Sequence, residues 1–448
     1  MTELTGWGSN LYAVCDLVLP ETPVGIARLV EPRGTIARGL GRSYGDAAIN
    51  EGGRVIGMTG LDRYLRFDEA TGTLECEAGV SLAEIIATYA PRGWFPSVTP
   101  GTRFVTIGGC IANDVHGKGH HSQGSFSSCV ESMTVMIANG EIVFASREQN
   151  ADLFWATFGG MGLLGLVLTA KIRLLRIETT YFRQSASAHG SLEQLMAAIQ
   201  EQEHEPYAVA TIDVFATGAR LGRGVLNAGD HARLDELPAH LAKAPLRVAG
   251  PPRLSVPFRL PDFTLTRLSV RLVNALILEI QRRGGPFAHY DKFIYPLDFI
   301  AHWNRGYGRR GFTQYQFIVP SDDATKTMRK ILTTIQDSGE LPFLNILKRM
   351  GAASGGLLSF PTDGYTLAVD FPIRPGLEAL LRKLDAIVVD VGGRIYLGKD
   401  SFVQKQTFQT MYPSFERWLQ IKKKYDPEGV FTSNLARRVG LVPSSLLR

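Results

Sequence analysis

The segment that most constrains this chain is a glycine-rich loop at residues 37–46, which reads Ala-Arg-Gly-Leu-Gly-Arg-Ser-Tyr-Gly-Asp. It follows a β-prone run at 34–37, and a second strand-like run follows at 52–58. Glycines let backbone N–H groups approach a phosphate-bearing ligand closely. A Rossmann dinucleotide site needs a helix to begin at the last glycine, and the second strand-like run excludes that arrangement. The loop therefore predicts a cofactor that lies across an α+β domain.

A chain of 448 residues is longer than one ordinary core supports, so we expect two or more domains. Its 45% hydrophobic and 20% charged residues are typical of a folded protein. Glycine is dense up to about residue 178, and longer helices then alternate with strands. We therefore predict a first domain over 1–178, a second domain over 179–393 and a C-terminal segment over 394–448. The second domain has the pattern of an antiparallel sheet covered by helices.

The net charge of +5 is too modest to indicate a nucleic-acid partner, and it is unevenly distributed. Residues 251–310 hold ten Lys and Arg against four Asp and Glu, which is +6, so the rest is about neutral. The four cysteines show no CxxC spacing, which favours reduced thiols in a cytoplasmic protein. The N-terminus has no signal-peptide pattern, and no run approaches the ~18 apolar residues of a membrane span. We expect a cytoplasmic protein, with peripheral contact at the inner face of the membrane left open.

Four glycine clusters fall in the first domain, at 39–45, 100–109, 115–121 and 159–165. Any one of them alone predicts only a tight turn. Four clusters within about 130 residues favour a shared role, because a diphosphate and a flat ring can be held by backbone amides.

The motifs Gly-Leu-Gly-Arg-Ser-Tyr-Gly at 39–45, Thr-Ile-Gly-Gly at 106–109 and Gly-Gly-Met-Gly at 159–162 resemble the FAD-binding domain of the vanillyl-alcohol-oxidase superfamily. Further segments resemble its polyprenyl-phosphoryl-ribose oxidases over nearly the whole chain. The most diagnostic of these are Asp-Val-His-Gly-Lys at 114–118, Trp-Asn-Arg at 303–305, Gln-Tyr-Gln-Phe at 314–317, Phe-Leu-Asn at 343–345 and Leu-Ala-Arg-Arg at 435–438. The resemblance implies an α+β, two-domain, PCMH-type FAD-binding fold with an antiparallel-sheet substrate domain. It also implies that the C-terminal segment returns to the FAD domain.

The implied activity is FAD-dependent oxidation of the 2′-hydroxyl of a polyprenyl-phosphoryl ribose to a ketone. This is the first half of an epimerisation to the arabinose compound in cell-envelope biosynthesis, and a separate NAD(P)-dependent keto-reductase would complete it. An FAD oxidase of free alditols or aldonolactones on the same fold is the alternative. A non-catalytic docking protein is a third interpretation, and the intact glycine loops, His116 and Lys399 argue against it.

The resemblance places the cofactor site at fifteen positions. They are Arg38, Gly39, Gly41, Arg42, Ser43, Tyr44, Gly101, Thr102, Thr106, Gly108, Gly109, His116, Gly117, Gly160 and Gly162. Covalent members of the superfamily commonly carry a histidine where this chain has Arg42. A guanidinium cannot form the histidyl-flavin bond, but its fork of donors can pair with a diphosphate. We therefore predict noncovalent FAD.

The resemblance gives Lys399 a place beside the flavin and the substrate, where a cation stabilises developing negative charge. The hydride would leave C2′ for flavin N5 while the hydroxyl loses its proton. The candidates for the base are Lys399, His116 and Tyr44, in that order. The predicted substrate-binding residues are Gln314, Gln316, Asn345, Lys348 and Lys399.

Strand alternation gives independent support, because Gln314 and Gln316 share one face of their strand, and Lys348 shares a face with Leu344 and Ile346. Buried polar groups need polar partners. A strand-end residue that reaches solvent remains the alternative for Lys348.

The histidines His116, His120 and His121 have a spacing that could supply two metal ligands. No carboxylate or cysteine completes a recognisable set, so we expect no metal and interpret His120 and His121 as loop histidines. His116 matches the family histidine beside the flavin.

The chain departs from other family members at Asn113, Thr366 and Ala368, which replace a cysteine, an asparagine and a cysteine. The tyrosine before the Pro-Leu-Asp element is also displaced, with Ile-Tyr-Pro at 294–296. These departures concern the substrate side and leave the cofactor motifs intact.

Residues 265–280 place apolar side chains on one helical face, with arginines around them. The apolar positions are Leu265, Leu268, Leu272, Leu276 and Ile280, and the arginines are Arg267, Arg271, Arg282 and Arg283. Two interpretations stay open: a helix packed on the domain, or an interfacial helix or lid that contacts the membrane over 265–283.

Overall fold

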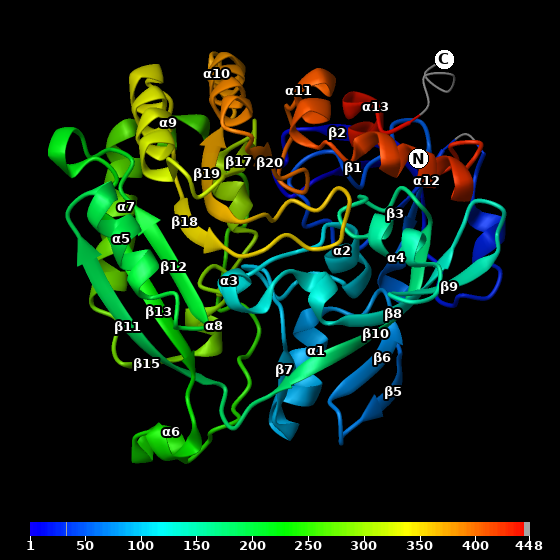
Figure 1. Cartoon of the computed structure of the whole chain (residues 1–448), viewed down its shortest axis with the longest axis horizontal. Helices are drawn as coiled ribbons and strands as arrows, with labels where there is room; N and C mark the ends of the chain where they lie inside the picture. The colour runs from blue at the N-terminus through cyan, green and yellow to red at the C-terminus, as the bar shows by residue number, and fades with distance from the viewer. Residues whose placement is uncertain (33, 443–448) are drawn as a thin grey trace.

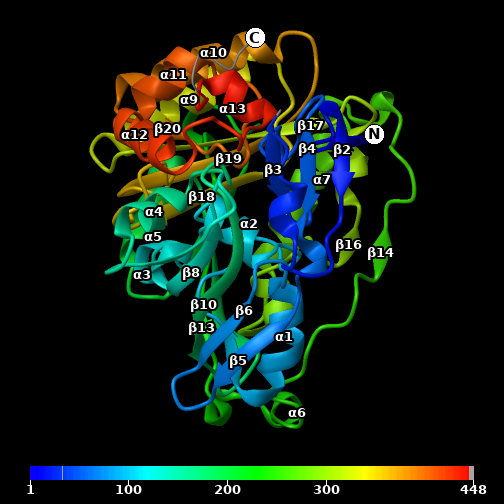
Figure 2. The ribbon, with the colours of Figure 1, turned by 90° about the vertical axis from the view of Figure 1, so that its right-hand side faces the viewer.

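A computed structural model describes residues 1–32 and 34–442 of the chain. Two sheet-based units lie side by side, and the C-terminal helices extend over the N-terminal unit (Figure 1). The view turned by 90° shows the C-terminal helices above the N-terminal unit (Figure 2). None of the helices in the described residues is long and apolar enough to cross a membrane.

The N-terminal unit contains two sheets. The first has the order β1 (Thr2–Thr5), β2 (Tyr12–Val18), β4 (Arg54–Gly57) and β3 (Thr35–Arg38), with β2 and β3 parallel to β4. The second has the order β5 (Tyr64–Asp68), β6 (Thr73–Glu77), β10 (Leu166–Arg176), β8 (Val130–Met136) and β9 (Ile142–Ser146), and β7 (Trp94–Pro96) also pairs with β10. The helices of this unit are α1 (Leu82–Tyr89), α2 (Ile107–Ala112), α3 (His120–Gln123) and α4 (Ala151–Thr157).

The second unit is built on an eight-stranded antiparallel sheet. Its order is β15 (Phe287–His289), β11 (Tyr181–His189), β13 (Gly224–His231), β12 (Tyr207–Ile212), β18 (Asn345–Met350), β19 (Gly364–Pro372), β17 (Phe312–Val319) and β20 (Arg394–Ile395). The other elements are α5 (Leu192–Glu201), α6 (Ala239–Ala242), β14 (Leu254–Ser255), α7 (Arg267–Arg282), α8 (Tyr290–Phe293), β16 (Ile300–Ala301), α9 (Ala324–Ser338) and α10 (Leu377–Asp390). Leu332 of α9 and Leu384 of α10 join Leu347 and Leu367 of the sheet in one apolar core.

Local sequence signals explain several of these elements. Ser81 and Glu84 form a capping box at the start of α1. The hairpin of β8 and β9 turns at Gly140, whose φ of 85° lies in the left-handed region. The helix α12 (Phe415–Tyr425) begins after Pro413, because the residue before a proline is pushed out of helical backbone geometry.

The C-terminal segment returns to the N-terminal unit through α11 (Lys405–Met411), α12 (Phe415–Tyr425) and α13 (Asn434–Val439). The Trp418 indole donates to the Ala156 carbonyl at 2.9 Å, and the buried Lys422 ammonium donates to the Leu163 carbonyl at 2.6 Å. The Thr35 N–H also donates to the Val430 carbonyl at 2.8 Å. Residues 443–448 of the predicted segment lie outside the described residues.

Candidate active site

The glycine loop after β3 is held in shape by Arg38. The Arg38 guanidinium donates to the carbonyls of Thr5, at 2.7 Å, and Ala48, at 3.0 Å. Gly41 adopts a φ of 65°, where L side chains are strained. Arg38 therefore holds the loop in shape, and two of its N–H groups donate to backbone carbonyls.

The second glycine segment lies directly against this loop. Thr106 caps α2 by accepting from the Gly109 N–H at 3.2 Å. A Cβ on Gly39 would overlap the Thr106 hydroxyl, so only glycine allows this approach. A Cβ on Gly101 would meet open space. The structure thus brings the 39–45 and 100–109 clusters together.

Arg42 presents a cation at the edge of these loops. Its guanidinium carbon lies 3.9 Å from the Trp7 ring centroid and 5.5 Å from that of Phe104. Burial lowers the pKa of Arg42. Its Nε is buried and has no partner among the described residues. Arg42 therefore has a donor free for an anion.

Asp114 fixes the loop that carries His116. This buried residue has a φ of 40°, and its carboxylate accepts from Ser125 at 2.8 Å and from Ser354 at 2.7 Å. It also accepts from the Ser359 hydroxyl. Because Ser354 and Ser359 belong to the second unit, Asp114 joins the two units beside the site.

His116 is buried, with one ring nitrogen occupied. The Gln316 Nε2 lies 3.0 Å from the His116 Nε2, and an amide nitrogen can only donate. The proton of a neutral His116 therefore sits on Nδ1, which is buried without a partner in the described chain. Burial, reinforced by Lys348, holds the His116 pKa well below its ordinary value, so the ring is neutral.

One face of the large sheet carries the predicted polar residues. Gln314 lies opposite Asp370, Gln316 opposite Ala368 and Lys348 opposite Thr366, and residues directly opposite share a face. Burial lowers the pKa of Lys348 to about 8, and β18 continues two residues beyond it, so Lys348 is not at the strand end.

Asn345 does not join these residues. It pairs with Val369, so strand alternation puts it on the opposite face from Lys348. It is buried, and both polar atoms of its side chain lack a partner among the described residues. The structure gives no support to the prediction that Asn345 binds substrate.

Sequence reasoning missed Asp370. Its carboxylate accepts from the Tyr307 hydroxyl at 2.7 Å and from Gln314 Nε2 at 2.6 Å. Burial raises the Asp370 pKa to about 6. The signal available was an acidic residue in the middle of a mostly apolar strand.

Lys118 is the last residue of the motif at 114–118, and sequence reasoning gave it no role of its own. Its ammonium donates to the Phe293 carbonyl, and burial together with Lys348 lowers its pKa to about 7. Lys118 and Lys348 are thus both desolvated, and Lys348 lies close enough to lower the Lys118 pKa.

Lys399 lies over the ring of Tyr44, with its Nζ 3.6 Å from the ring centroid. Burial lowers the Lys399 pKa to about 7, the Asp370 charge opposes this shift and Lys348 adds to it. Tyr44 packs edge-on against Phe312 at 5.2 Å, and its pKa is raised well above the ordinary value by burial.

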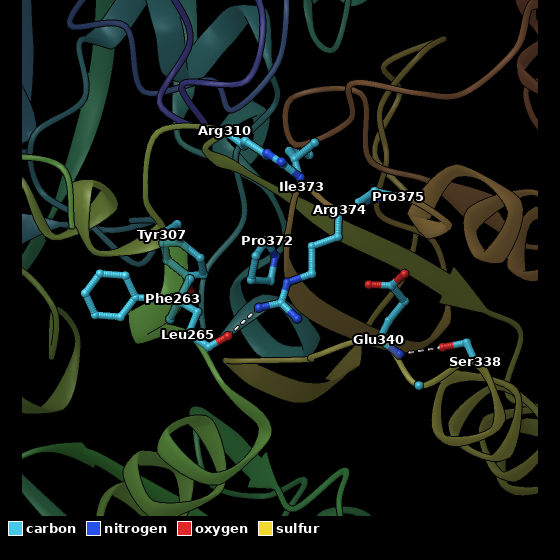
Figure 3. A pocket seen from close by; sticks show the side chains of 11 residues that line it. Phe263, Leu265, Tyr307, Arg310, Ser338, Glu340, Pro372, Ile373, Arg374 and Pro375 are labelled. Carbon is cyan, nitrogen blue, oxygen red and sulfur yellow. Dashed lines mark hydrogen bonds between the residues drawn. The ribbon is translucent and has the colours of Figure 1, made fainter. Parts of the chain in front are cut away.

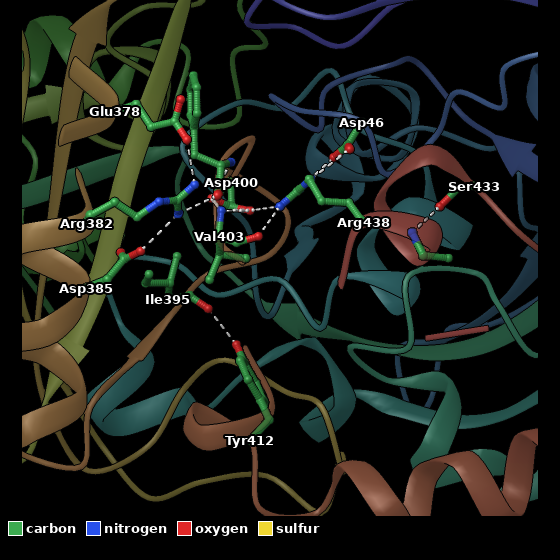
Figure 4. Close-up of polar contacts among 12 residues, drawn as sticks. Asp46, Glu378, Arg382, Asp385, Ile395, Asp400, Val403, Tyr412, Ser433 and Arg438 are labelled. Carbon is green, nitrogen blue, oxygen red and sulfur yellow. Dashed lines mark hydrogen bonds and ion pairs between the residues drawn. The ribbon is translucent and has the colours of Figure 1, made fainter. Parts of the chain in front are cut away.

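The backbone around Lys399 is tied to the glycine loop. The Tyr44 N–H donates to the Gly398 carbonyl at 3.0 Å. Arg438 binds Asp400 at 2.8 Å and Asp46 at 2.7 Å, as Figure 4 shows. Asp400 follows Lys399 and Asp46 ends the glycine loop, so this ion triad sets the position of Lys399 relative to the loop.

These features fit FAD. Three buried polar atoms, Arg42 Nε, His116 Nδ1 and Asn113 Oδ1, have no partner in the described chain. The residues that carry these atoms lie in or beside the glycine clusters, and no other atom lies where a Cβ of residue 101 would stand. A ligand with a diphosphate and a polar ring would satisfy donors and acceptors of this kind. Among the described residues, no group of three His, Cys, Asp or Glu side chains could hold a metal ion.

Comparison with known proteins agrees with this geometry. Residues 30–146 match the FAD binding domain family, and residues 309–439 match the D-arabinono-1,4-lactone oxidase family. Decaprenylphosphoryl-β-D-ribose oxidase of Mycolicibacterium smegmatis is 40% identical over 98% of both chains. The chain belongs to the decaprenylphosphoryl-β-D-ribose oxidase family.

More distant relatives are also dehydrogenases or oxidases by name. L-gulono-1,4-lactone dehydrogenase of Mycobacterium tuberculosis is 22% identical over 96% of this chain and 97% of its own. L-gulonolactone oxidase of Mus musculus is 30% identical over 30% of each chain. This member of the decaprenylphosphoryl-β-D-ribose oxidase family is an FAD-dependent oxidoreductase that acts on CH–OH groups. The predicted resemblance and the two-domain PCMH-type fold are confirmed.

Proposed function

We propose that the enzyme oxidises the 2′-hydroxyl of a polyprenyl-phosphoryl-β-D-ribose to the 2′-keto sugar, the first half of an epimerisation to the arabinose compound. The observation that carries this choice is the pair of desolvated lysines, Lys118 and Lys348. A phosphodiester beside them would compensate charges that burial otherwise disfavours. A free alditol or lactone would leave both uncompensated.

FAD, when bound, supplies the hydride acceptor. Its binding is noncovalent in this proposal, because Arg42 stands at the position of the histidine that forms the covalent bond in other superfamily members. The free Nε of Arg42 supports a role in binding the diphosphate.

Lys399 acts as the base that takes the proton of the 2′-hydroxyl. Its pKa of about 7 makes the neutral amine available near neutral pH. Tyr44 stays protonated because its pKa is raised far above neutrality. His116 Nε2 is engaged by Gln316, so its remaining group, the Nδ1–H, serves as a donor.

Asp370 is a positioning residue for this proton transfer. Its charge raises the Lys399 pKa against the desolvation that lowers it. Tyr307 and Gln314 hold the carboxylate in place through their two hydrogen bonds. Gln314, Gln316 and Lys348 line the same sheet face and would hold the sugar phosphate.

Two further parts of the proposal concern partners. An NAD(P)-dependent keto-reductase would reduce the 2′-keto product, because epimerisation needs the ketone reduced from the other face. The enzyme would work in the cytoplasm, peripherally at the inner face of the cytoplasmic membrane.

Anaerobic flavin reduction tests the substrate. Purified holoenzyme is mixed with a short-chain prenyl-phosphoryl ribose and, separately, with ribose, xylitol and an aldonolactone, while the absorbance of oxidised flavin is followed. The proposal predicts rapid bleaching with the prenyl-phosphoryl ribose alone. Bleaching by a free polyol or lactone, with none by the prenyl-phosphoryl ribose, would instead support the alternative of a free-sugar oxidase.

A further inference from the structure

Helix α7 leaves its apolar stripe uncovered. Leu268, Leu272, Leu276 and Ile280 are 68%, 62%, 59% and 63% exposed. The helix is anchored through Val270 and Asn274, which are buried and lie on the opposite side at 3.6 residues per turn. The helix therefore packs on the domain through the side opposite the stripe, and the stripe is a surface without a partner in the described chain.

Positive charge surrounds the stripe. Arg267 and Arg271 lie along one side, and Arg282 and Arg283 lie at the C-terminal end. Glu279 is the one acidic residue of α7, and both terminal arginines pair with it, Arg282 at 2.8 Å. The helix thus combines an exposed leucine stripe with a net positive border, the composition of interfacial helices that bind anionic lipids.

The start of α7 is connected to the active-site strand. Arg374, two residues after the end of β19, donates to the Leu265 carbonyl, as Figure 3 shows. Both line a 630 Å³ cavity together with Tyr307, whose hydroxyl binds Asp370. Phe263, 79% exposed, lines the same cavity. A surface bound by α7 would therefore lie next to this cavity, which Tyr307 connects to Asp370.

We propose that the α7 stripe docks the enzyme on the surface of an anionic phospholipid bilayer. The leucines would enter the headgroup boundary and the arginines would contact lipid phosphates. The inference rests in part on the proposed function, because a prenyl-linked substrate is held in a bilayer. Lipid binding itself is measured without substrate, so the two proposals fail separately.

Vesicle flotation of the FAD-loaded enzyme tests the inference. Vesicles of phosphatidylglycerol with phosphatidylcholine are compared with vesicles of phosphatidylcholine alone. We expect the wild type to float with the anionic vesicles, and L272S/L276S to lose at least about tenfold in binding, given the transfer free energy of two leucines. R267Q/R271Q should weaken binding and reduce its salt dependence. L65S, at a leucine 48% exposed on β5, is the matched control and should bind like the wild type.

Turnover of a soluble short-chain substrate should be the same in L272S/L276S and the wild type, which separates docking from catalysis. Equal flotation of L272S/L276S and the wild type would overturn the inference. So would a wild type that floats with neither vesicle at low salt. A wild-type dimer that L272S/L276S abolishes, in a protein that does not float, would assign the stripe to a second copy of this chain.

Discussion

Replacing Asp370 by asparagine should move the acidic limb of the pH–rate profile to lower pH. Lys399 accepts a proton only as the neutral amine, so kcat/KM should rise as pH increases through its pKa of about 7. Asp370, with a pKa of about 6, is mostly ionised at pH 7 and holds the Lys399 pKa up. Removing that charge leaves desolvation unopposed, so the Lys399 pKa must fall.

The size of the shift follows from the environment. An opposite charge nearby in a buried site is worth roughly one to three pKa units. At pH 6 about one-tenth of wild-type Lys399 is neutral, and about half or more of it would be neutral in D370N. Both contacts can persist in D370N, because the amide oxygen can still accept from Gln314 and the amide NH2 can donate to the Tyr307 oxygen, which also accepts.

The matched control is Asp385→Asn. Asp385 also has a pKa raised to about 6 by burial and also accepts from a tyrosine, Tyr315, at 3.0 Å. It belongs to α10, and Tyr315 neighbours Gln314 on the strand and so points to the other face of the sheet. D385N should lower the free energy of unfolding and leave the acidic limb of the kcat/KM–pH profile at its wild-type pH. An unchanged acidic limb in D370N, or an equal shift in D385N, would show that Asp370 does not hold up the Lys399 pKa.

Three further predictions concern the base, the cofactor and the ion triad. K399M should lower kcat by about 10²–10⁴-fold in steady-state assays, with less effect on KM. A kcat within tenfold of the wild-type value would show that Lys399 is not the base. Acid precipitation should release all flavin into the supernatant, and a flavin-containing pellet would contradict noncovalent binding opposite Arg42. R438M should cost about 3–5 kcal/mol in denaturant unfolding, because Asp46 and Asp400 stay buried without a cation. A loss below 1 kcal/mol would mean that water replaces the arginine.

Local signals carried much of the fold. The glycine loop, the capping box at Ser81 and the helix over 324–338 depend on residues close together in the sequence, and the structure contains each of them. The cofactor motifs could be recognised for the same reason, because glycines at fixed positions determine the backbone geometry of a loop.

The parts that sequence reasoning missed depend on long-range pairing. The partner of Asp370 became visible only when β17 and β19 placed it opposite Gln314, and the partner of Lys118 only when α8 placed the Phe293 carbonyl beside it. Asn345 was assigned by resemblance, although alternation from Lys348 already put it on the other face. Periodicity showed the stripe of α7 but not what covers it, because that depends on neighbours distant in sequence.

Hydride removal from C2′ can be measured with a prenyl-phosphoryl ribose carrying deuterium at that carbon. We expect slower flavin reduction with the labelled substrate than with the unlabelled one, and a product that has lost the deuterium and carries a ketone at C2′. Retention of the deuterium in the oxidised product, with equal rates for both substrates, would contradict this expectation.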